Sequence, residues 1–531
     1  MNPFFESREA PDKTAIIVGE RTMSYRALDL ASRALAEALR EVGLDRGDGI
    51  AILAPNVPEF FIAAWAAQRS GLYYTPIGSH LKAGEIGYIL ADSGAKALLV
   101  EKTLAPQALE AMRALAPNAA PFLFSLGGSV AGARPVEELT PSATASEDVE
   151  GGDLLYTSGT TGRPKGVKRP LDFGPLGSDT HRVTRLRDLF EMDRNTVFYT
   201  PAPIYHAAPL RFAMTVLRMG ATLVMDEKFE PRRSLATIAA RNVTHSQWVP
   251  TMFVRLLALS DAERTAFRAP AHRKAIHSGA PCAVSVKRAM IDWWGPILHE
   301  YYSGTESAGF THVTSQEWLR FPGTVGKPWG CKTHILSDAG AELEPGEIGA
   351  VYFEGCAGLA YHNDEEKTRE AQSMEGWITM GDIGFVNDEG YLFLCDRKNF
   401  VIVSGGVNIY PKEVEEALEG HPAVLEAAVF GLPDETFGEC VQAVVQVRDP
   451  VDARAEVADA LHAHVRMTLA AFKAPKQIAF EHDLPRLPSG KLEKRRLRDA
   501  YRDRTDRGFA PTPTAPEREP SLSNAKQDER S

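Results

Sequence analysis

The stretch "TSGTTGRPKG" (157–166) is the clearest candidate for chemistry in this chain of 531 residues. It combines glycines and hydroxyl side chains with Arg163 and Lys165, and it follows the apolar pair Leu154 and Leu155. Small residues allow a tight turn whose amide N–H groups point inward, while hydroxyls and cations add further donors. The stretch therefore predicts a polyphosphate-binding loop at the end of a sheet strand. It is not a GxxxxGK[ST] loop, because no Ser or Thr follows Lys165.

The bulk composition limits the class of protein. A chain of this length predicts two or more domains. A formal net charge of −11 argues against a nucleic-acid partner. The five cysteines contain no CxxC pair, which argues against a zinc site or disulfides. Without a leader sequence or an apolar run long enough to span a bilayer, we expect a cytoplasmic protein with no transmembrane segment.

Strands and helices alternate through most of the chain, which predicts a parallel sheet covered by helices. Strands are expected at 49–55, 96–101, 221–227, 243–249, 274–279 and 297–304. Helices are expected at 24–44, 57–70, 83–92 and 231–241.

The pattern changes near residue 396. A short strand ending in paired glycines, a helix over 411–420, two strands, a helix over 453–470 and a strand near 477–481 predict a small α+β unit. We therefore expect an α/β protein with three parts: a large N-terminal domain of parallel-sheet α/β subdomains (1–396), a small mobile α+β C-terminal domain (397–503) and a disordered tail (504–531).

Further motifs follow the first one in a fixed order. They are "YYSGTES" (301–307), "GWITMGDIG" (376–384), "DRKNFVIVSGGVNIYPKEVE" (396–415) and "LPRLPSGKLEK" (484–494). Together with "TSGTTGRPKG", these five strings resemble the motifs of the adenylate-forming (AMP-forming) enzymes, in particular the fatty-acid and aryl-acid CoA ligases. The resemblance extends from the first helices to about residue 500.

This resemblance implies a two-step reaction. A carboxylate attacks the α-phosphate of ATP, giving an acyl-adenylate and pyrophosphate, and a thiol then displaces AMP. The substrate itself is the nucleophile, so the protein has to hold two anions in line and neutralise the charge that develops. ATP, Mg²⁺ and coenzyme A are the expected cofactors and substrates.

The resemblance also assigns roles to residues. Lys491, Thr305 and Glu306 are the expected catalytic residues, with Glu306 as the Mg²⁺ ligand, since Mg²⁺ prefers oxygen donors and keeps waters and phosphates in its shell. The expected ATP-binding residues are Thr157, Ser158, Gly159, Thr160, Thr161, Gly162, Lys165, Gly279, Ala280, Tyr302, Asp382 and Arg397. Among them, Asp382 is suited to accept two ribose hydroxyls.

The C-terminal domain is expected to act as a lid. By resemblance, Lys491 enters the site for the first step and leaves for the second, about a hinge at Asn399. The opposite face of the domain, with Ser404, Gly405 and Gly406, would then complete the CoA tunnel. The hinge position more often carries Asp or Lys.

The acyl pocket is expected to include His206, Ala207, Trp248 and Gly304. The segments expected to line it carry no free carboxylate for an ammonium group, because Glu306 is assigned to the metal, and an unpaired buried charge is costly. An apolar acid is therefore favoured over an amino acid, with fatty, aryl and steroid side-chain acids left open. Two departures from the family motifs lie nearby, Ser303 and Met380.

Coenzyme A is the expected acceptor, since no carrier domain follows Lys491. A fatty acyl-AMP ligase that delivers to a separate carrier protein remains an alternative, and so does a catalytically silent nucleotide-binding homologue. The intact Lys165, Glu306 and Asp382 argue against the silent homologue. The sequence leaves the oligomeric state open, a homodimer included.

Overall fold

The computed structural model describes residues 4–116, 119–142, 147–157, 164–355, 360–397, 400–405, 407–434, 436–486 and 492–506. Among these residues, 4–394 form one compact unit and 395–506 form a second one. The division lies two residues before the domain boundary that the sequence predicts.

The first unit contains a sheet of seven strands within the described residues, in the order β7-β6-β5-β3-β4-β8-β9. Its strands are β3 (Gly49–Leu53), β4 (Tyr73–Ile77), β5 (Ala97–Glu101), β6 (Phe122–Leu126), β7 (Arg134–Pro135), β8 (Gly152–Thr157) and β9 (Lys165–Lys168). All neighbours pair in parallel except β8 and β9, which are antiparallel. These two strands flank the predicted polyphosphate loop.

A second sheet has thirteen strands in the described part of the chain, in the order β17-β18-β19-β20-β16-β15-β14-β13-β12-β10-β11-β1-β2. Its strands are β1 (Thr14–Val18), β2 (Arg21–Ser24), β10 (Val197–Thr200), β11 (Thr222–Met225), β12 (His245–Trp248), β13 (Lys274–His277), β14 (Leu298–Tyr302), β15 (Thr311–Thr314), β16 (Thr324–Pro328), β17 (Lys332–Leu336), β18 (Gly349–Glu354), β19 (Ile378–Val386) and β20 (Leu392–Arg397). The strands β14, β13, β12, β10, β11 and β1 pair in parallel in this order, as the alternating pattern predicts, and β2 pairs antiparallel with β1. The pairs β14–β15, β15–β16, β16–β20, β17–β18 and β18–β19 are antiparallel.

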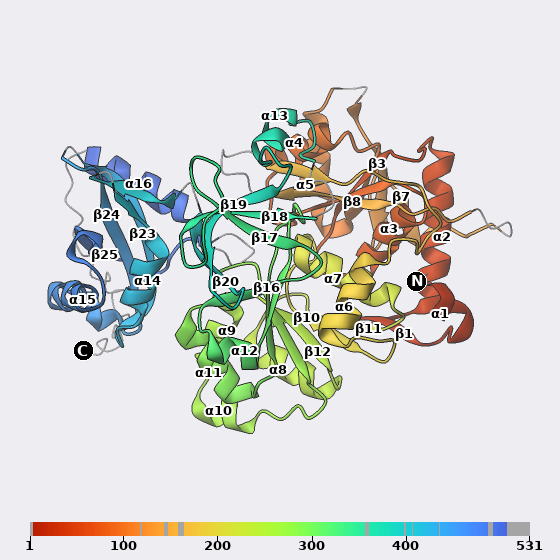
Figure 1. Cartoon of the computed structure of the whole chain (residues 1–531). Coiled ribbons are helices and arrows are strands. Elements are labelled where there is room, and N and C mark those ends of the chain that lie inside the picture. The colour runs from red at the N-terminus through yellow and green to blue at the C-terminus, as the bar shows by residue number, and fades with distance from the viewer. Residues whose placement is uncertain are drawn as a thin grey trace, which may run out of the picture. The chain divides into compact units, whose positions relative to one another are not determined.

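Helices cover both sheets of the first unit (Figure 1). They are α1 (Phe4–Glu9), α2 (Tyr25–Glu41), α3 (Pro58–Gln68), α4 (Ala83–Ser93), α5 (Ala105–Arg113), α6 (His181–Phe190), α7 (Ala207–Arg218), α8 (Pro231–Ala240), α9 (Pro250–Leu257), α10 (Asp261–Ala266), α11 (Val284–Trp294), α12 (Ser315–Arg320) and α13 (Glu365–Glu370), with short 3₁₀ helices η1 (Lys102–Leu104) and η3 (Val136–Glu138).

The largest core lies between the two sheets. It joins Ile52 of β3 and Leu223 of β11 to apolar side chains of α2, α3, α6 and α7. Helix α3, "PEFFIAAWAAQ", buries ten of its eleven residues, because it is packed on all sides. Helices α6 and α7 are held in place by this core.

The second unit is a smaller α+β body. Its described elements are β21 (Ile402–Ser404), β22 (Val407–Ile409), α14 (Pro411–Glu419), β23 (Val424–Asp434), β24 (Gly438–Val447), η5 (Pro450–Asp452), α15 (Ala455–Thr468), η6 (Ala471–Lys473), β25 (Gln477–Phe480) and α16 (Lys494–Asp506). Lys494 is enclosed there, with its Nζ 2.8 Å from Glu415 and 3.7 Å from Asp396. In neither unit does a described helix have the length and hydropathy that a membrane span requires.

Candidate active site

The two flanks of the polyphosphate loop lie opposite each other on neighbouring strands. Thr157 ends β8 and pairs with Lys165, which begins β9. The predicted phosphate ligands Ser158, Gly159, Thr160, Thr161 and Gly162 lie outside the described residues. The Nζ atom of Lys165 is 3.4 Å from a carboxylate oxygen of Asp364. Burial and then the charge of Lys367 lower the pKa of Lys165.

The segment 360–364 connects this strand to the predicted metal ligand. His362 donates its backbone N–H to the carbonyl of Gly166 at 2.8 Å, and Tyr361 forms a β-bridge with Val167. The hydroxyl of Tyr361 donates to Oε1 of Glu306 at 3.2 Å. One segment thus fixes both the lysine strand and Glu306. Sequence reasoning missed Tyr361, because it is remote in sequence from both motifs that it contacts.

The loop 303–309 follows β14 and carries Thr305 and Glu306. The hydroxyl of Ser303 donates to the carbonyl of Gly309 at 2.6 Å and closes the loop. A Cβ atom at Gly304 would lie 2.5 Å from Oε2 of Glu306 and 2.6 Å from Sδ of Met380, so a larger residue would have to displace the ends of these two side chains. The two departures from the family motifs are therefore accommodated in the structure: Ser303 closes the loop, and Met380 packs where Gly304 leaves room.

Arg211 of helix α7 holds this loop against strand β8. Its Nη1 atom donates to the carbonyl of Thr305 at 2.8 Å and to the hydroxyl of Ser307 at 3.1 Å. Its Nε atom donates to Asp153 of β8 at 2.6 Å. Ser307 has a φ of 53°, a conformation that non-glycine residues seldom adopt, and the contact with Arg211 supports it. Burial alone would raise the pKa of Asp153, but the charges of Arg211 and Arg182 hold it well below its usual range.

The residues predicted to bind the nucleoside come together only in part. Tyr302 at the end of β14 donates its hydroxyl to the buried carboxylate of Asp382 on β19. Gly279 follows β13 with a φ of +89°, and Ala280 is half-buried beside it. Arg397 belongs to the second unit, where its backbone N–H donates to Asp396 at 2.7 Å.

The predicted acyl-pocket residues occupy different environments. His206 is the N-cap of α7, directly before Ala207, and its ring lies 4.6 Å from that of Tyr205. Trp248 is 1% exposed and packs in an aromatic cluster with Phe253 and Trp294.

A buried asparagine that sequence reasoning missed fixes the chain just before His206. The side chain of Asn56 accepts from the N–H of Ile204 at 2.8 Å and donates to the carbonyls of Ala202 and Asp226. The sequence does give one sign of this role, since Asn56 is a polar residue directly after the apolar strand expected at 49–55.

In the second unit, Ser404 ends β21 and Gly405 has a φ of +58°. The N–H of Gly405 donates to the carbonyl of Phe437 at 2.8 Å, so the end of β21 is held against the start of β24. The predicted lysine Lys491, hinge residue Asn399 and tunnel residue Gly406 lie outside the described residues.

Sequence comparison decides the family of this chain. The family model described as "AMP-binding enzyme" matches residues 5–360, and the model for the C-terminal domain of the same enzymes matches residues 413–491. The chain belongs to the AMP-binding enzyme family. Its motif loops and its fold are thus those of an adenylate-forming enzyme.

Several members of the AMP-binding enzyme family are similar over nearly their whole length. The long-chain-fatty-acid–CoA ligase FadD13 of Mycobacterium tuberculosis is 32% identical, over 90% of this chain and 93% of the relative. The fatty acid–[acyl-carrier-protein] ligase ScoC of Streptomyces coeruleorubidus is 30% identical, over 94% and 95%. The structure of o-succinylbenzoate CoA synthetase from Bacillus subtilis with its acyl-adenylate intermediate superimposes with a TM-score of 0.77 at 27% identity, covering 94% of this chain and 98% of that one.

The donor set at Glu306 suits the Mg²⁺ expected for an AMP-binding enzyme. Among the described residues, no group of three or more His, Cys, Asp or Glu side chains could hold a metal alone. Mg²⁺ commonly takes one or two protein carboxylates and completes its octahedral shell with water and substrate phosphates. Glu306, with one oxygen held by Tyr361, fits that role.

Proposed function

We propose that this chain activates an organic acid of largely apolar body with ATP and Mg²⁺, and then transfers the acyl group to coenzyme A. The observation that carries the proposal is the continuous set of contacts from Lys165 through the segment 360–364 to Glu306. These contacts support the roles proposed here for Lys165, as a phosphate-binding cation, and for Glu306, as a metal-binding carboxylate of the same site.

Each step can be assigned to residues of this chain. A carboxylate oxygen of the acid attacks the α-phosphorus of ATP, and pyrophosphate leaves. Thr305 donates to the α-phosphate, Lys165 holds the outer phosphates, and Glu306 would hold Mg²⁺, which neutralises phosphate charge. Asp382, oriented by Tyr302, accepts the ribose hydroxyls.

In the second step the CoA thiol loses its proton and its sulfur attacks the acyl carbonyl, so that the thioester forms and AMP leaves. We propose that Lys491 serves only the first step, and that Ser404 and Gly405 border the path of the thiol arm in the second.

An acyl-carrier-protein acceptor is the second candidate. The 30% identity to the carrier-protein ligase ScoC over most of both chains favours it. The two acceptors differ in product, since only one gives a free CoA thioester.

The test is turnover of the purified protein with ATP, Mg²⁺ and a panel of fatty, aryl and dicarboxylic acids, with and without CoA. We expect acid-dependent pyrophosphate exchange without CoA, and AMP with an acyl-CoA when CoA is added. The Lys491→Ala variant should lose exchange but still form thioester from supplied acyl-adenylate. Exchange without any acyl-CoA would favour the carrier protein, and no exchange with any acid would overturn the proposal.

A further inference from the structure

Helix α4 holds both flanks of the polyphosphate loop through two tyrosine hydroxyls. Tyr156 of β8 donates its hydroxyl to a carboxylate oxygen of Asp92 on α4 at 2.6 Å. Tyr88 lies one turn earlier on α4 and donates its own hydroxyl to the carbonyl of Pro164 at 3.1 Å. Because Tyr88 and Asp92 are four residues apart, one face of the helix makes both contacts.

Each contact lies beside a residue that is predicted to bind ATP. Tyr156 directly precedes Thr157, and Pro164 directly precedes Lys165. Thr157 and Lys165 are paired with each other across β8 and β9. Since a residue cannot shift without its chain neighbour, the two hydrogen bonds restrict where the hydroxyl of Thr157 and the ammonium group of Lys165 can lie.

Asp92 also holds the segment 360–364, through its backbone. Its carbonyl accepts a hydrogen bond from Nε2 of His362 at 2.9 Å and another from Nδ2 of Asn363 at 3.3 Å. The same segment contacts Glu306, the predicted metal ligand. One residue near the end of α4 therefore joins the strand before the loop, by its side chain, to the segment that orients the metal ligand, by its main chain.

Open space lies between α4 and Lys165. A cavity of about 120 Å³ that opens to solvent is lined by Tyr88, Asp92, Lys165 and His362, among other residues. The hydrogen bonds therefore span a gap that side-chain packing does not fill. The bond from Tyr156 is charge-assisted, because its acceptor is a carboxylate. Burial and then the charge of Asp92 raise the pKa of the Tyr156 hydroxyl well above its usual range, so that it stays a donor.

We propose that Tyr156, Asp92 and Tyr88 are positioning residues for the outer phosphates of ATP, because they place Thr157 and Lys165. This inference rests on the proposed function and extends it to a helix that none of the five sequence motifs includes. An acyl-adenylate carries no outer phosphates, so the second step, in which the thiol displaces AMP, should not depend on these contacts. That difference between the two steps separates a positioning role from a general structural one.

The test removes one hydrogen bond at a time and measures the two steps separately. In Tyr156→Phe, the KM for ATP in acid-dependent pyrophosphate exchange should rise by about 5- to 20-fold, the order expected for one hydrogen bond to a charged group. The KM for the acid, and thioester formation from supplied acyl-adenylate, should stay close to the wild-type values. In Tyr88→Phe the KM for ATP should rise by about 2- to 5-fold, because the lost acceptor is a neutral carbonyl.

Asp92 offers two variants with opposite expectations. Asp92→Asn keeps an oxygen that can accept from Tyr156, so its KM for ATP should stay close to that of the wild type. Asp92→Ala should resemble Tyr156→Phe. The double variant Tyr156→Phe/Asp92→Ala should be no worse than the more impaired single variant, because both substitutions remove the same hydrogen bond.

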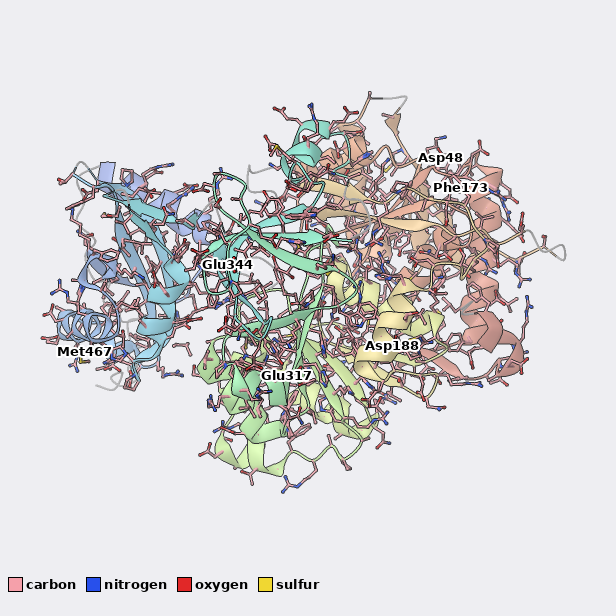
Figure 2. All side chains as sticks on the ribbon, in the orientation of Figure 1. Asp48, Phe173, Asp188, Glu317, Glu344 and Met467 are labelled. Carbon is pink, nitrogen blue, oxygen red and sulfur yellow. The ribbon has the colours of Figure 1, made fainter. Side chains whose placement is uncertain are left out.

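Tyr391→Phe is the matched control. Tyr391 donates its hydroxyl at 3.2 Å to Oε1 of Glu317, which is labelled in Figure 2, so this variant also loses one phenol–carboxylate hydrogen bond in the first unit. Its kinetic constants should equal those of the wild type. An unchanged KM for ATP in Tyr156→Phe and Tyr88→Phe, or an equal loss of both steps, would overturn the positioning role while leaving the ligase function intact. Absence of exchange by the wild type with every acid would instead count against the proposed function.

Discussion

The guanidinium of Arg211 donates a hydrogen bond to the backbone carbonyl of Thr305 at 2.8 Å. The same side chain is anchored to Asp153 at the other end, so strand β8 and the loop 303–309 are joined through one residue. Both elements lead into motifs that are assigned to ATP. The relative position of the two motifs therefore depends on Arg211.

Replacing Arg211 by Gln should lower kcat for adenylate formation by about 10- to 100-fold, because small displacements of positioned groups are costly in the transition state. The KM for ATP should change less. Single-turnover adenylate formation is the measurement, with Arg187→Gln as control, since Arg187 is exposed and pairs with its neighbour Asp188. A variant that unfolds at a lower temperature yet retains the wild-type kcat would show that Arg211 serves stability alone.

Gly304→Ala should impair catalysis strongly, because the new methyl group would displace either the carboxylate of Glu306 or the side chain of Met380. Gly84→Ala is the control, since a Cβ atom at Gly84 meets nothing within 4 Å. Pyrophosphate exchange at several Mg²⁺ concentrations is the readout. Wild-type exchange in Gly304→Ala would contradict the prediction, because it would show that the methyl group is accommodated without disturbing the function of Glu306.

Tyr361→Phe removes the hydroxyl that donates to Glu306 and leaves the aromatic ring. We expect a higher Mg²⁺ concentration for half-maximal activity, by a factor of about 5 to 10, which corresponds to one hydrogen bond to a charged group. Activity at saturating Mg²⁺ should approach that of the wild type. An unchanged Mg²⁺ dependence would contradict the role of Glu306 as the metal ligand.

Buried histidines predict sensitivity to acid. Burial lowers the pKa of His272 and His299 to about 3, and that of His245 and His312 to about 4. The unfolded chain takes up protons near pH 6.5 and the folded protein does not, so the stability present above that pH declines as the pH falls toward about 4. Within this window, each histidine lowers the free energy of unfolding by about 1.4 kcal/mol for every unit by which the pH falls.

Urea unfolding of the first unit at pH 7, 6 and 5 measures this effect. Nδ1 of His299 and Nε2 of His312 are 2.9 Å apart, so a shared hydrogen bond requires that at least one ring stays neutral. His312→Gln should therefore flatten the pH dependence. A urea concentration at half-unfolding that is the same at pH 7 and at pH 5 would contradict the prediction.

The motif strings predicted the family, because each motif is a short continuous run of residues that can be recognised in the sequence. The alternation of strands and helices predicted much of the architecture. The runs 243–249 and 274–279 became neighbouring parallel strands, β12 and β13, as expected for alternating strands and helices. The antiparallel strands from β15 to β20 were not predicted, because their apolar pattern is interrupted by charged and turn residues.

The contacts that orient the site could not be read from spacing. Asp153, Arg211 and Thr305 belong to three distant segments, and only the packing of α7 between the two sheets brings them together. Trp248 itself was predicted to line the acyl pocket. Its side chain is 1% exposed and packs against Trp294, and its place in the acyl pocket stays a prediction.

Transfer of oxygen from the acid to the nucleotide tests the central claim most directly. In the proposed reaction a carboxylate oxygen bonds to the α-phosphorus and stays there when the thiol displaces AMP. With an acid that carries ¹⁸O at both carboxylate oxygens, mass spectrometry should find one ¹⁸O in each AMP released. Unlabelled AMP, or ADP as the nucleotide product, would contradict the account.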